Sequence, residues 1–407
     1  MTWQPIPGGI AAPRGFRAAG VAAGLKPSGL PDLALLLAPE QASCAGSFTT
    51  NLVRAACVDL CAQRLQQCGG RARAVIINAG QANACLGERE LSDSLRITAA
   101  VAAELGLAEE AVQICSTGVI GQPIPMDTLL AGLGPLLASL SRQGGAAAAQ
   151  AILTTDLVAK DIALEADLAG RTVRIGGMAK GSGMIHPAMA TMLAVLSCDA
   201  GVEPRLWQAI VDRAVERSFN AVSVDGDTST NDTCLAFAAG PPLAAEQLAA
   251  LEEGVMAVCT HLARAIARDG EGATCLLEVA VEGAASAADA RSIARTVCAS
   301  SLVKTAIHGR DPNWGRIVAA VGRAGVPLDA HAIALWLGDT QLMAAGRPLS
   351  FDRQAVSAYL EARAAGAYLR DDSVAIRIAV GDGSGAGLAW GCDLSDQYIR
   401  INADYTT

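Results

Sequence analysis

One threonine, Thr191, stands between a lysine- and glycine-rich loop and a run of small apolar residues in GGMAKGSGMIHPAMATMLAVLSCDA, residues 176–200. The chain has only four histidines and no plausible Ser–His–Asp set, so a nucleophile would need its base from elsewhere. A threonine at a chain's amino terminus supplies its own base, the α-amine. Thr191 would become such a terminus if its hydroxyl cut the Ala190–Thr191 bond. The small residues Ala190, Gly181 and Gly183 would leave the carbonyl of that bond sterically open.

Packing is the ordinary role of such a threonine. Interior threonines are packed or capping residues far more often than nucleophiles, and Gly, Ala and Met around a lone hydroxyl are common in protein cores. On residues 176–200 alone, both interpretations of Thr191 stay open.

Two glycine-rich segments resemble nucleotide-binding loops, but neither has the required context. GDGSGAG, residues 381–387, lies between two expected strands, whereas a dinucleotide cradle needs a strand-to-helix turn. We expect a hairpin turn there. GGMAKGSG, residues 176–183, places its lysine before the last glycines and lacks the order of a P-loop.

The composition is that of an alanine-rich globular protein of 407 residues. The mean hydropathy is +0.34, yet aromatic residues are only 3%, and no apolar run approaches the ~20 residues that span a bilayer. The start, MTWQPIPGG, has neither the basic nor the apolar region of an export signal, so we expect a cytoplasmic protein. A net charge of −9 without a Lys/Arg run disfavours nucleic acid or an anionic membrane as the main partner.

Metal and disulfide sites are not expected. The twelve cysteines are scattered singly, with one CxxxC at Cys57 and Cys61 and no CxxC pair, which is typical of small buried apolar residues in a reducing cytosol. The four histidines, at 186, 261, 308 and 331, do not lie at ligand spacing from one another.

Strands and helices are expected in both halves of the chain, which predicts a mixed α/β or α+β fold. Hydrophobic periodicity and turn residues place an internal boundary near the glycine-rich residues 176–190. The expected strands are 32–40, 73–80, 111–118 and 373–380, and the expected helices are 92–106, 203–219, 245–269, 288–308 and 352–364.

The segment KGSGMIHPAMATML, residues 180–193, strongly resembles the signature KGSGMI-x-P-N-MATML of the ornithine acetyltransferase family, also called glutamate N-acetyltransferase. Further matching motifs follow in family order, so the resemblance covers essentially the whole chain. They are GLKPSGLPDLALLLAP, FTTNLVRAA, STGVIG (116–121), TTD (154–156), SFNAVSVDGDTSTND (218–232), DGEGAT (269–274), LVKTAIHGRDPNWGRI (302–317) and YIRINADYTT.

This resemblance implies a mixed α/β fold of the ArgJ/DmpA type, cut between Ala190 and Thr191 into chains 1–190 and 191–407. It implies that Thr191 acts as nucleophile twice, in self-cleavage and in acetyl transfer, and that Thr117 and Gly118 form the oxyanion hole. No metal and no organic cofactor is implied. The implied substrate-binding residues are Thr154, Lys180, Thr191, Glu271, Asn402 and Thr407.

The implied reaction moves an acetyl group from N2-acetyl-L-ornithine to L-glutamate in the cyclic pathway of arginine biosynthesis. Acetyl-CoA is a further donor if the chain is of the family's bifunctional kind, and the family's two chains typically assemble as α2β2. Lys180 suits the carboxylate of an amino acid, and Glu271 suits its ammonium. An amidase or aminopeptidase with an N-terminal threonine, and an amino-acid sensor without turnover, are the rival interpretations.

Departures from the family pattern leave the acetyl donor and acceptor open, and a paralogue with another acceptor is an alternative. Ala188 replaces the usual Asn, and His186 stands where a small residue is common. Gln81, with Ala79 and Leu86, alters the usual NSGNANACTG, and Cys275 replaces a lysine. We expect Cys275 and Ala188 to weaken ligand positioning, and we assign the Gly, Asp and Ser/Thr residues of 218–232 to turns.

Overall fold

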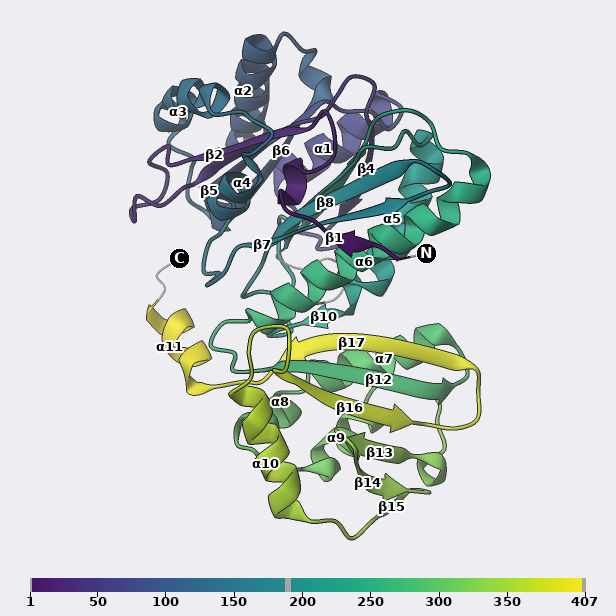
Figure 1. The fold of residues 1–407 in the computed structure, drawn as a ribbon. Helices are drawn as coiled ribbons and strands as arrows, with labels where there is room; N and C mark the ends of the chain where they lie inside the picture. The colour runs from purple at the N-terminus through teal and green to yellow at the C-terminus, as the bar shows by residue number, and fades with distance from the viewer. Residues whose placement is uncertain (1, 187–191, 405–407) are drawn as a thin grey trace.

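The computed structural model describes residues 2–186 and 192–404, and the upper region of the molecule contains a pair of β-sheets between two layers of helices (Figure 1). The mixed α/β class is confirmed. The six-stranded sheet has the order β1 (Gln4–Pro5), β7 (Lys160–Asp167), β8 (Thr172–Lys180), β9 (Leu193–Cys198), β11 (Thr233–Ala238), β4 (Ser43–Phe48). The four-stranded sheet has the order β2 (Arg17–Val21), β3 (Leu33–Leu37), β5 (Ala74–Gln81), β6 (Val112–Val119).

Strand β9 shows how both faces of a central strand are buried. Successive side chains of a strand point to opposite faces. Leu193 and Val195 therefore pack into the core between the two sheets, whereas Ala194 and Leu196 pack into the core beneath the helices. Because both faces are covered, the first four residues of the strand are a continuous apolar run instead of an alternating one.

Helices cover the outer faces of the two sheets. α1 (Ala56–Gln67), α2 (Glu88–Leu105) and α3 (Met126–Ala138) pack on the four-stranded sheet. α4 (Gly145–Ala151) is different: its Ala148, Ala149 and Ala151 belong to the core between the two sheets, with Leu193 and Val195. α5 (Pro204–Arg217) and α6 (Leu248–Arg268) cover the six-stranded sheet. Pro204 begins α5, and the carboxylate of Glu203 caps it by accepting the N–H groups of Arg205 and Leu206.

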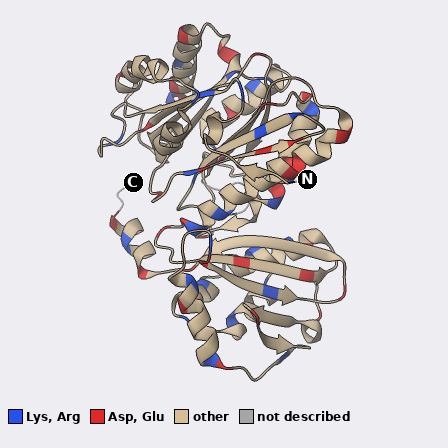
Figure 2. Cartoon of the chain, in the orientation of Figure 1, with Lys and Arg blue, Asp and Glu red and all other residues tan. Residues whose placement is uncertain are grey.

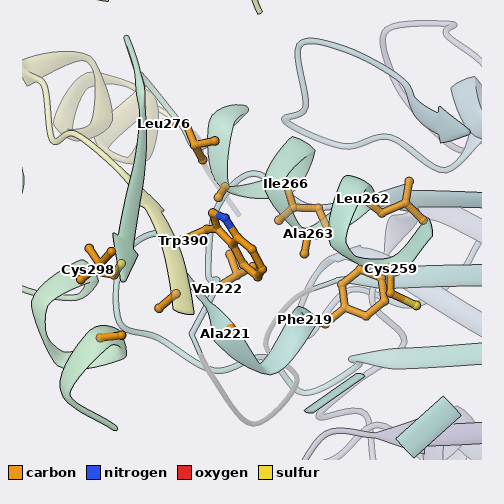
Figure 3. Packing of buried hydrophobic residues seen from close by; sticks show 14 of the residues in the cluster. Phe219, Ala221, Val222, Cys259, Leu262, Ala263, Ile266, Leu276, Cys298 and Trp390 are labelled. Carbon is orange, nitrogen blue, oxygen red and sulfur yellow. The ribbon is translucent and has the colours of Figure 1, made fainter. Parts of the chain in front are cut away.

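A seven-stranded sheet forms the lower region of the molecule in Figure 1. α6 joins the two regions, and Figure 3 shows Trp390, Val222 and Ile266 close together at this contact. The strand order is β10 (Val222–Ser223), β17 (Gly385–Cys392), β12 (Leu276–Ala284), β16 (Ser373–Ala379), β13 (Ala334–Leu337), β14 (Thr340–Ala344), β15 (Arg347–Pro348). The helices of this region are α7 (Ala287–Cys298), α8 (Ser301–His308), α9 (Trp314–Gly322), α10 (Arg353–Ala364) and α11 (Asp396–Asp404).

Most predicted elements are found, with three differences. The helix expected over 288–308 is two helices, α7 and α8, because the Ser300 hydroxyl accepts the Val303 N–H and caps a new helix. Residues 381–387 do not close a hairpin: β12 lies between β16 and β17 and pairs with both. The glycine-rich boundary expected at 176–190 is not a border between sheets, since β8 and β9 on its two sides pair with each other.

Charged residues of both signs are interspersed over both regions of the molecule (Figure 2). Along the described stretches of the chain, no helix is long and apolar enough to cross a membrane. Ten of the twelve cysteines are buried, as the scattered spacing predicts, and all twelve are free thiols.

Candidate active site

The oxyanion pair expected at Thr117 and Gly118 lies near the end of β6, where this strand runs parallel to β5. Gly118 is opposite Gly80 and has a φ of +127°. A Cβ on Gly118 would lie 2.3 Å from the carbonyl carbon of Gly80, so only glycine fits. The Ser116 hydroxyl donates a 2.7 Å hydrogen bond to Oδ1 of Asn78. The backbone around buried Thr117 is thus held in one conformation, as an oxyanion hole requires.

A row of three paired residues crosses the six-stranded sheet at the edge where β8 ends and β9 begins. Lys180 ends β8 opposite Leu193 of β9, and Leu193 is opposite Thr233 of β11. Leu193 follows the predicted nucleophile by two residues in the sequence. The predicted residues Ala190, Thr191 and Thr407, and the departure at Ala188, lie outside the described residues.

Asp232, immediately before β11, holds the residue that follows the predicted nucleophile. Its Oδ1 accepts the backbone N–H of Met192 at 2.8 Å. Its Oδ2 is buried and accepts no hydrogen bond from any described group. Burial raises the pKa of this carboxyl well above its usual range, against the opposing hydrogen bond from Met192 and the charge of Lys180.

Asn231 connects this carboxyl to β6, the strand of the expected oxyanion pair. Its side-chain amide donates to the carbonyl oxygen of Ala82 at 2.6 Å and to that of Ser116 at 3.0 Å. Asn231 therefore contacts Ser116, the residue before Thr117, and the adjacent Asp232 contacts Met192, the residue after Thr191. Sequence reasoning assigned Asn231 and Asp232 to turn chemistry, and that assignment missed them. The signal was a pair of polar side chains directly before a fully buried strand.

Lys180 places a positive charge at this edge. Its side chain is 3% exposed, and its ammonium lies 3.9 Å from Oδ2 of Asp156. Burial lowers the pKa of Lys180, whereas the charge of Asp156 raises it. The same Asp156 oxygen accepts the Thr154 backbone N–H at 3.0 Å, which brings two of the predicted substrate residues together.

Glu271 and Asn402 also come together, although they are far apart in the sequence. The Asn402 amide, on α11, donates a 2.7 Å hydrogen bond to Oε2 of Glu271. The Glu271 N–H donates to the Ser182 carbonyl at 3.0 Å, two residues after Lys180. A Cβ at position 183 would lie 2.5 Å from the Glu271 carboxyl carbon, so Gly183 leaves the room that this carboxylate occupies.

Two departures from the family pattern lie apart from these residues. His186 contacts the Ser223 hydroxyl through Nδ1 at 3.1 Å and lines a cavity of about 600 Å³ with Arg295; burial, and then the charge of Arg295, lowers its pKa. Cys275 is fully buried before β12, where its N–H donates to Asp393 at 3.1 Å. The expected effect of Cys275 on ligand positioning stays a prediction.

Gln81 has a local structural role. Its amide donates to the Leu25 carbonyl at 3.0 Å and thereby ties the loop after β2 to the end of β5. Lys26, the residue after Leu25, has its side-chain Cγ 3.7 Å from where a Cβ of Gly80 would lie. Burial lowers the pKa of Lys26, whereas the charges of Asp32 and Asp156 raise it.

This arrangement is suited to acyl transfer on an amino acid. Strand β6 places the Thr117 hydroxyl and the Gly118 N–H, the expected oxyanion donors, next to each other near its end. The adjoining residues offer a buried ammonium for a carboxylate and a buried carboxylate for an ammonium, which are the two charges of a zwitterionic ligand.

Comparison with known proteins points the same way. A family model described as the ArgJ family matches residues 17–407. The "Arginine biosynthesis bifunctional protein ArgJ" of Prochlorococcus marinus (strain MIT 9313) is 70% identical over 405 residues, covering 100% of this chain and 95% of its own. The protein of the same name from Parasynechococcus marenigrum (strain WH8102) is 67% identical over 405 residues, covering 100% and 97%.

A solved structure is also similar in sequence. The crystal structure of ornithine acetyltransferase from Mycobacterium tuberculosis, complexed with ornithine, is 45% identical to this chain. The match covers 46% of this chain and 98% of that one, with a TM-score of 0.43.

Proposed function

The chain belongs to the ArgJ family, and on this premise we propose that Thr191 is the nucleophile through which it works. The protein is an ornithine acetyltransferase of arginine biosynthesis, that is, a glutamate N-acetyltransferase. In the proposed cycle, N2-acetyl-L-ornithine acetylates the Thr191 hydroxyl and ornithine leaves. L-Glutamate then attacks the acetyl ester, and N-acetylglutamate is released.

One observation supports this site above all others. Asn231 and Asp232, adjacent in the chain, hydrogen-bond the strand that ends in the oxyanion pair and the residue that follows Thr191. The two components that acyl transfer needs, a nucleophile and oxyanion donors, are thereby attached to one short, buried segment.

Self-cleavage is the first proposed reaction and gives chains 1–190 and 191–407. The Thr191 hydroxyl attacks the Ala190 carbonyl carbon, the C–N bond breaks as the nitrogen takes a proton, and water hydrolyses the resulting ester. The Thr191 nitrogen is an amide before this step and cannot serve as base. Asp232 supports the proposal because its Oδ2 is buried without a described partner and its raised pKa strengthens it as a base.

Acetyl transfer is the second reaction, and here the freed α-amine of Thr191 is the base. It takes the hydroxyl proton as Oγ attacks the acetyl carbonyl and gives a proton to the departing amine of ornithine. Thr117, through its hydroxyl, and Gly118, through its N–H, stabilise the oxyanion.

The substrate residues are assigned by charge. Lys180 binds the ligand's carboxylate, and Glu271, oriented by Asn402, binds an ammonium. Thr154 and Thr407 complete the predicted set.

Three wider features belong to the same proposal. The cleaved chains stay together as an α2β2 assembly in the cytoplasm. Acetyl-CoA serves as a second acetyl donor, in keeping with the bifunctional name that the Prochlorococcus and Parasynechococcus relatives carry.

Intact-protein mass spectrometry before and after N-acetylornithine tests the nucleophile. We expect two chains that begin at residues 1 and 191, and a gain of one acetyl group on the second chain alone. Thr191→Ala should remain one chain and stay unmodified. An active wild-type protein that persists as a single chain would refute the proposal.

A product assay separates this function from a hydrolase with the same nucleophile. With acetylornithine and a panel of amino-acid acceptors, the transferase yields N-acetylglutamate, whereas an amidase yields free acetate. Ready acetylation of another amine with glutamate ignored would keep the nucleophile and overturn the acceptor.

A further inference from the structure

We propose that Lys160 is a positioning residue for the substrate's carboxylate: it occupies Asp156 and so leaves the neighbouring ammonium of Lys180 open to the ligand. The inference rests on the proposed role of Lys180 in binding that carboxylate. Neither Lys160 nor its two acidic partners, Asp156 and Asp269, is among the substrate residues that the family resemblance implies.

Lys160 itself is closed to any ligand. It begins β7, its side chain is fully buried, and its ammonium lies 2.7 Å from Oδ1 of Asp156 and 2.6 Å from Oδ2 of Asp269. A third hydrogen bond, of 3.2 Å, goes to the carbonyl oxygen of Val158. An ammonium has three donors, and all three are used.

Lys180 is the opposite case. It is a close neighbour of Lys160, because Lys160 is opposite Ala179 in the β7–β8 ladder. Its side chain is 3% exposed, yet its ammonium stays 3.9 Å from Asp156, beyond hydrogen-bonding distance. Among the described residues it donates no hydrogen bond. Burying a cation costs free energy unless it is paired with an anion, so the open donors of Lys180 suit an anionic ligand.

The hydrogen bonds of Asp156 explain why it does not take up Lys180. Its Oδ1 accepts Lys160 and the Gly181 N–H at 2.7 Å, and its Oδ2 accepts the Thr154 N–H. These bonds fix the carboxylate. Burial opposes its ionisation, but the charges of Lys180 and Lys160 outweigh burial and hold its pKa well below the usual range.

Removing the Lys160 charge should therefore redirect Lys180. In Lys160→Met, Asp156 and Asp269 lose their shared cation, and Asp156 draws the Lys180 ammonium into a direct bond. The substrate's carboxylate then competes with a resident carboxylate. The loss should concern ligands that carry the carboxylate and spare ligands that lack it.

The experiment compares N-acetylornithine with N-acetylputrescine, which lacks only the α-carboxylate. We expect Lys160→Met to raise KM for acetylornithine about tenfold or more with little change in kcat, and to leave kcat/KM for acetylputrescine unchanged. Lys160→Arg, which keeps the charge, should keep the preference for acetylornithine. Equal losses on both substrates would overturn the inference.

Asp269→Asn is the opposite test and keeps the shape of the side chain. It removes a negative charge, so Lys180 should lose its proton at lower pH, whereas Lys160→Met should move that loss to higher pH. The readout is the alkaline pH at which KM for acetylornithine rises. If Lys160→Met does not fold, Asp269→Asn is sufficient as a test. The inference is then overturned if the alkaline rise of KM in Asp269→Asn moves to higher pH or does not move.

Lys180→Met distinguishes this inference from the proposed function. If Lys180→Met retains the preference for acetylornithine, the assigned role of Lys180 is wrong. If Lys180→Met loses the preference and Lys160→Met keeps it, only the positioning role of Lys160 is wrong.

Discussion

The Asn402 amide donates a 2.7 Å hydrogen bond to Oε2 of Glu271, and this bond ties the last described helix to the loop after α6. Glu271 is 8% exposed, so the bond orients a nearly buried carboxylate. The backbone N–H of Glu271 donates to the carbonyl of Ser182, two residues after Lys180. A side chain near the end of the chain thus belongs to the same site as residues near its middle.

The first prediction concerns this carboxylate. Glu271→Gln keeps the shape but removes the charge that would bind the substrate's ammonium, so kcat/KM for N-acetylornithine should fall about tenfold to a hundredfold. Asn402→Ala should cause a smaller loss, because it only frees the carboxylate to rotate. Steady-state kinetics measure both.

Asp396→Asn is the matched control on the same helix. Asp396 pairs with Arg400 at 3.1 Å, and both side chains are well exposed, so the change should leave kinetics and stability unaltered. An equal loss in Asp396→Asn and Glu271→Gln would show that only the helix matters, not the carboxylate.

The second prediction concerns the base of self-cleavage. Asp232→Asn retains an oxygen for the Met192 N–H but removes the carboxylate, so the uncleaved chain should accumulate while the fold is kept. Cleavage of the wild-type precursor should slow as pH falls, because protonation removes the base, and the raised pKa places that loss above the usual range of an aspartate. Gel electrophoresis of freshly made protein over time measures the rate.

Asp225→Asn provides the comparison within the same loop. Asp225 also binds backbone near the cleavage point, through the N–H groups of Met184 and Ile185. Cleavage at the wild-type rate in Asp232→Asn, or equal slowing in both variants, would remove Asp232 from the role of base.

The third prediction concerns the oxyanion strand. Gly118→Ala should destabilise the protein by about 1–3 kcal/mol from backbone strain, with a further cost from the contact at Gly80, and should displace the N–H on which transfer depends. Gly121→Ala has positive φ but open space around it, so it should show the strain without the loss of activity. Thermal unfolding and transfer rates separate the two; retained activity in Gly118→Ala would contradict the assignment.

Local sequence patterns predicted the elements but not their partners. The apolar spacing of α5 and the alternation of β16 are visible in the sequence, because they depend on residues a few positions apart. The order of strands is not, because β9 and β11 pair across α5, and β12 separates β16 from β17. The hairpin expected at 381–387 was wrong for this reason.

The site divides in the same way. Motifs indicated Lys180 and Glu271, but the role of Asp232 depends on Thr233 lying opposite Leu193, which only the folded sheet establishes. The function of Lys160 depends likewise on two carboxylates, one four residues away and one brought close by the end of α6. Buried ion pairs between distant segments leave no local signal.

The last prediction concerns pH. The α-amine of Thr191 acts as base only when it is neutral, and a model α-amino group titrates near pH ~7.7–8.0. Acetyl transfer by the cleaved protein should therefore rise as pH increases through that range and fall on its acid side. His186 is the imidazole nearest the cleavage point in the sequence. It contacts Ser223, and burial lowers its pKa, so its titration should not determine the fall of activity at acid pH. His186→Ala should keep both the activity and the fall of kcat at acid pH, measured as kcat against pH on fully processed enzyme. Complete loss of activity in His186→Ala with processing intact would show that the base is the imidazole and not the amine.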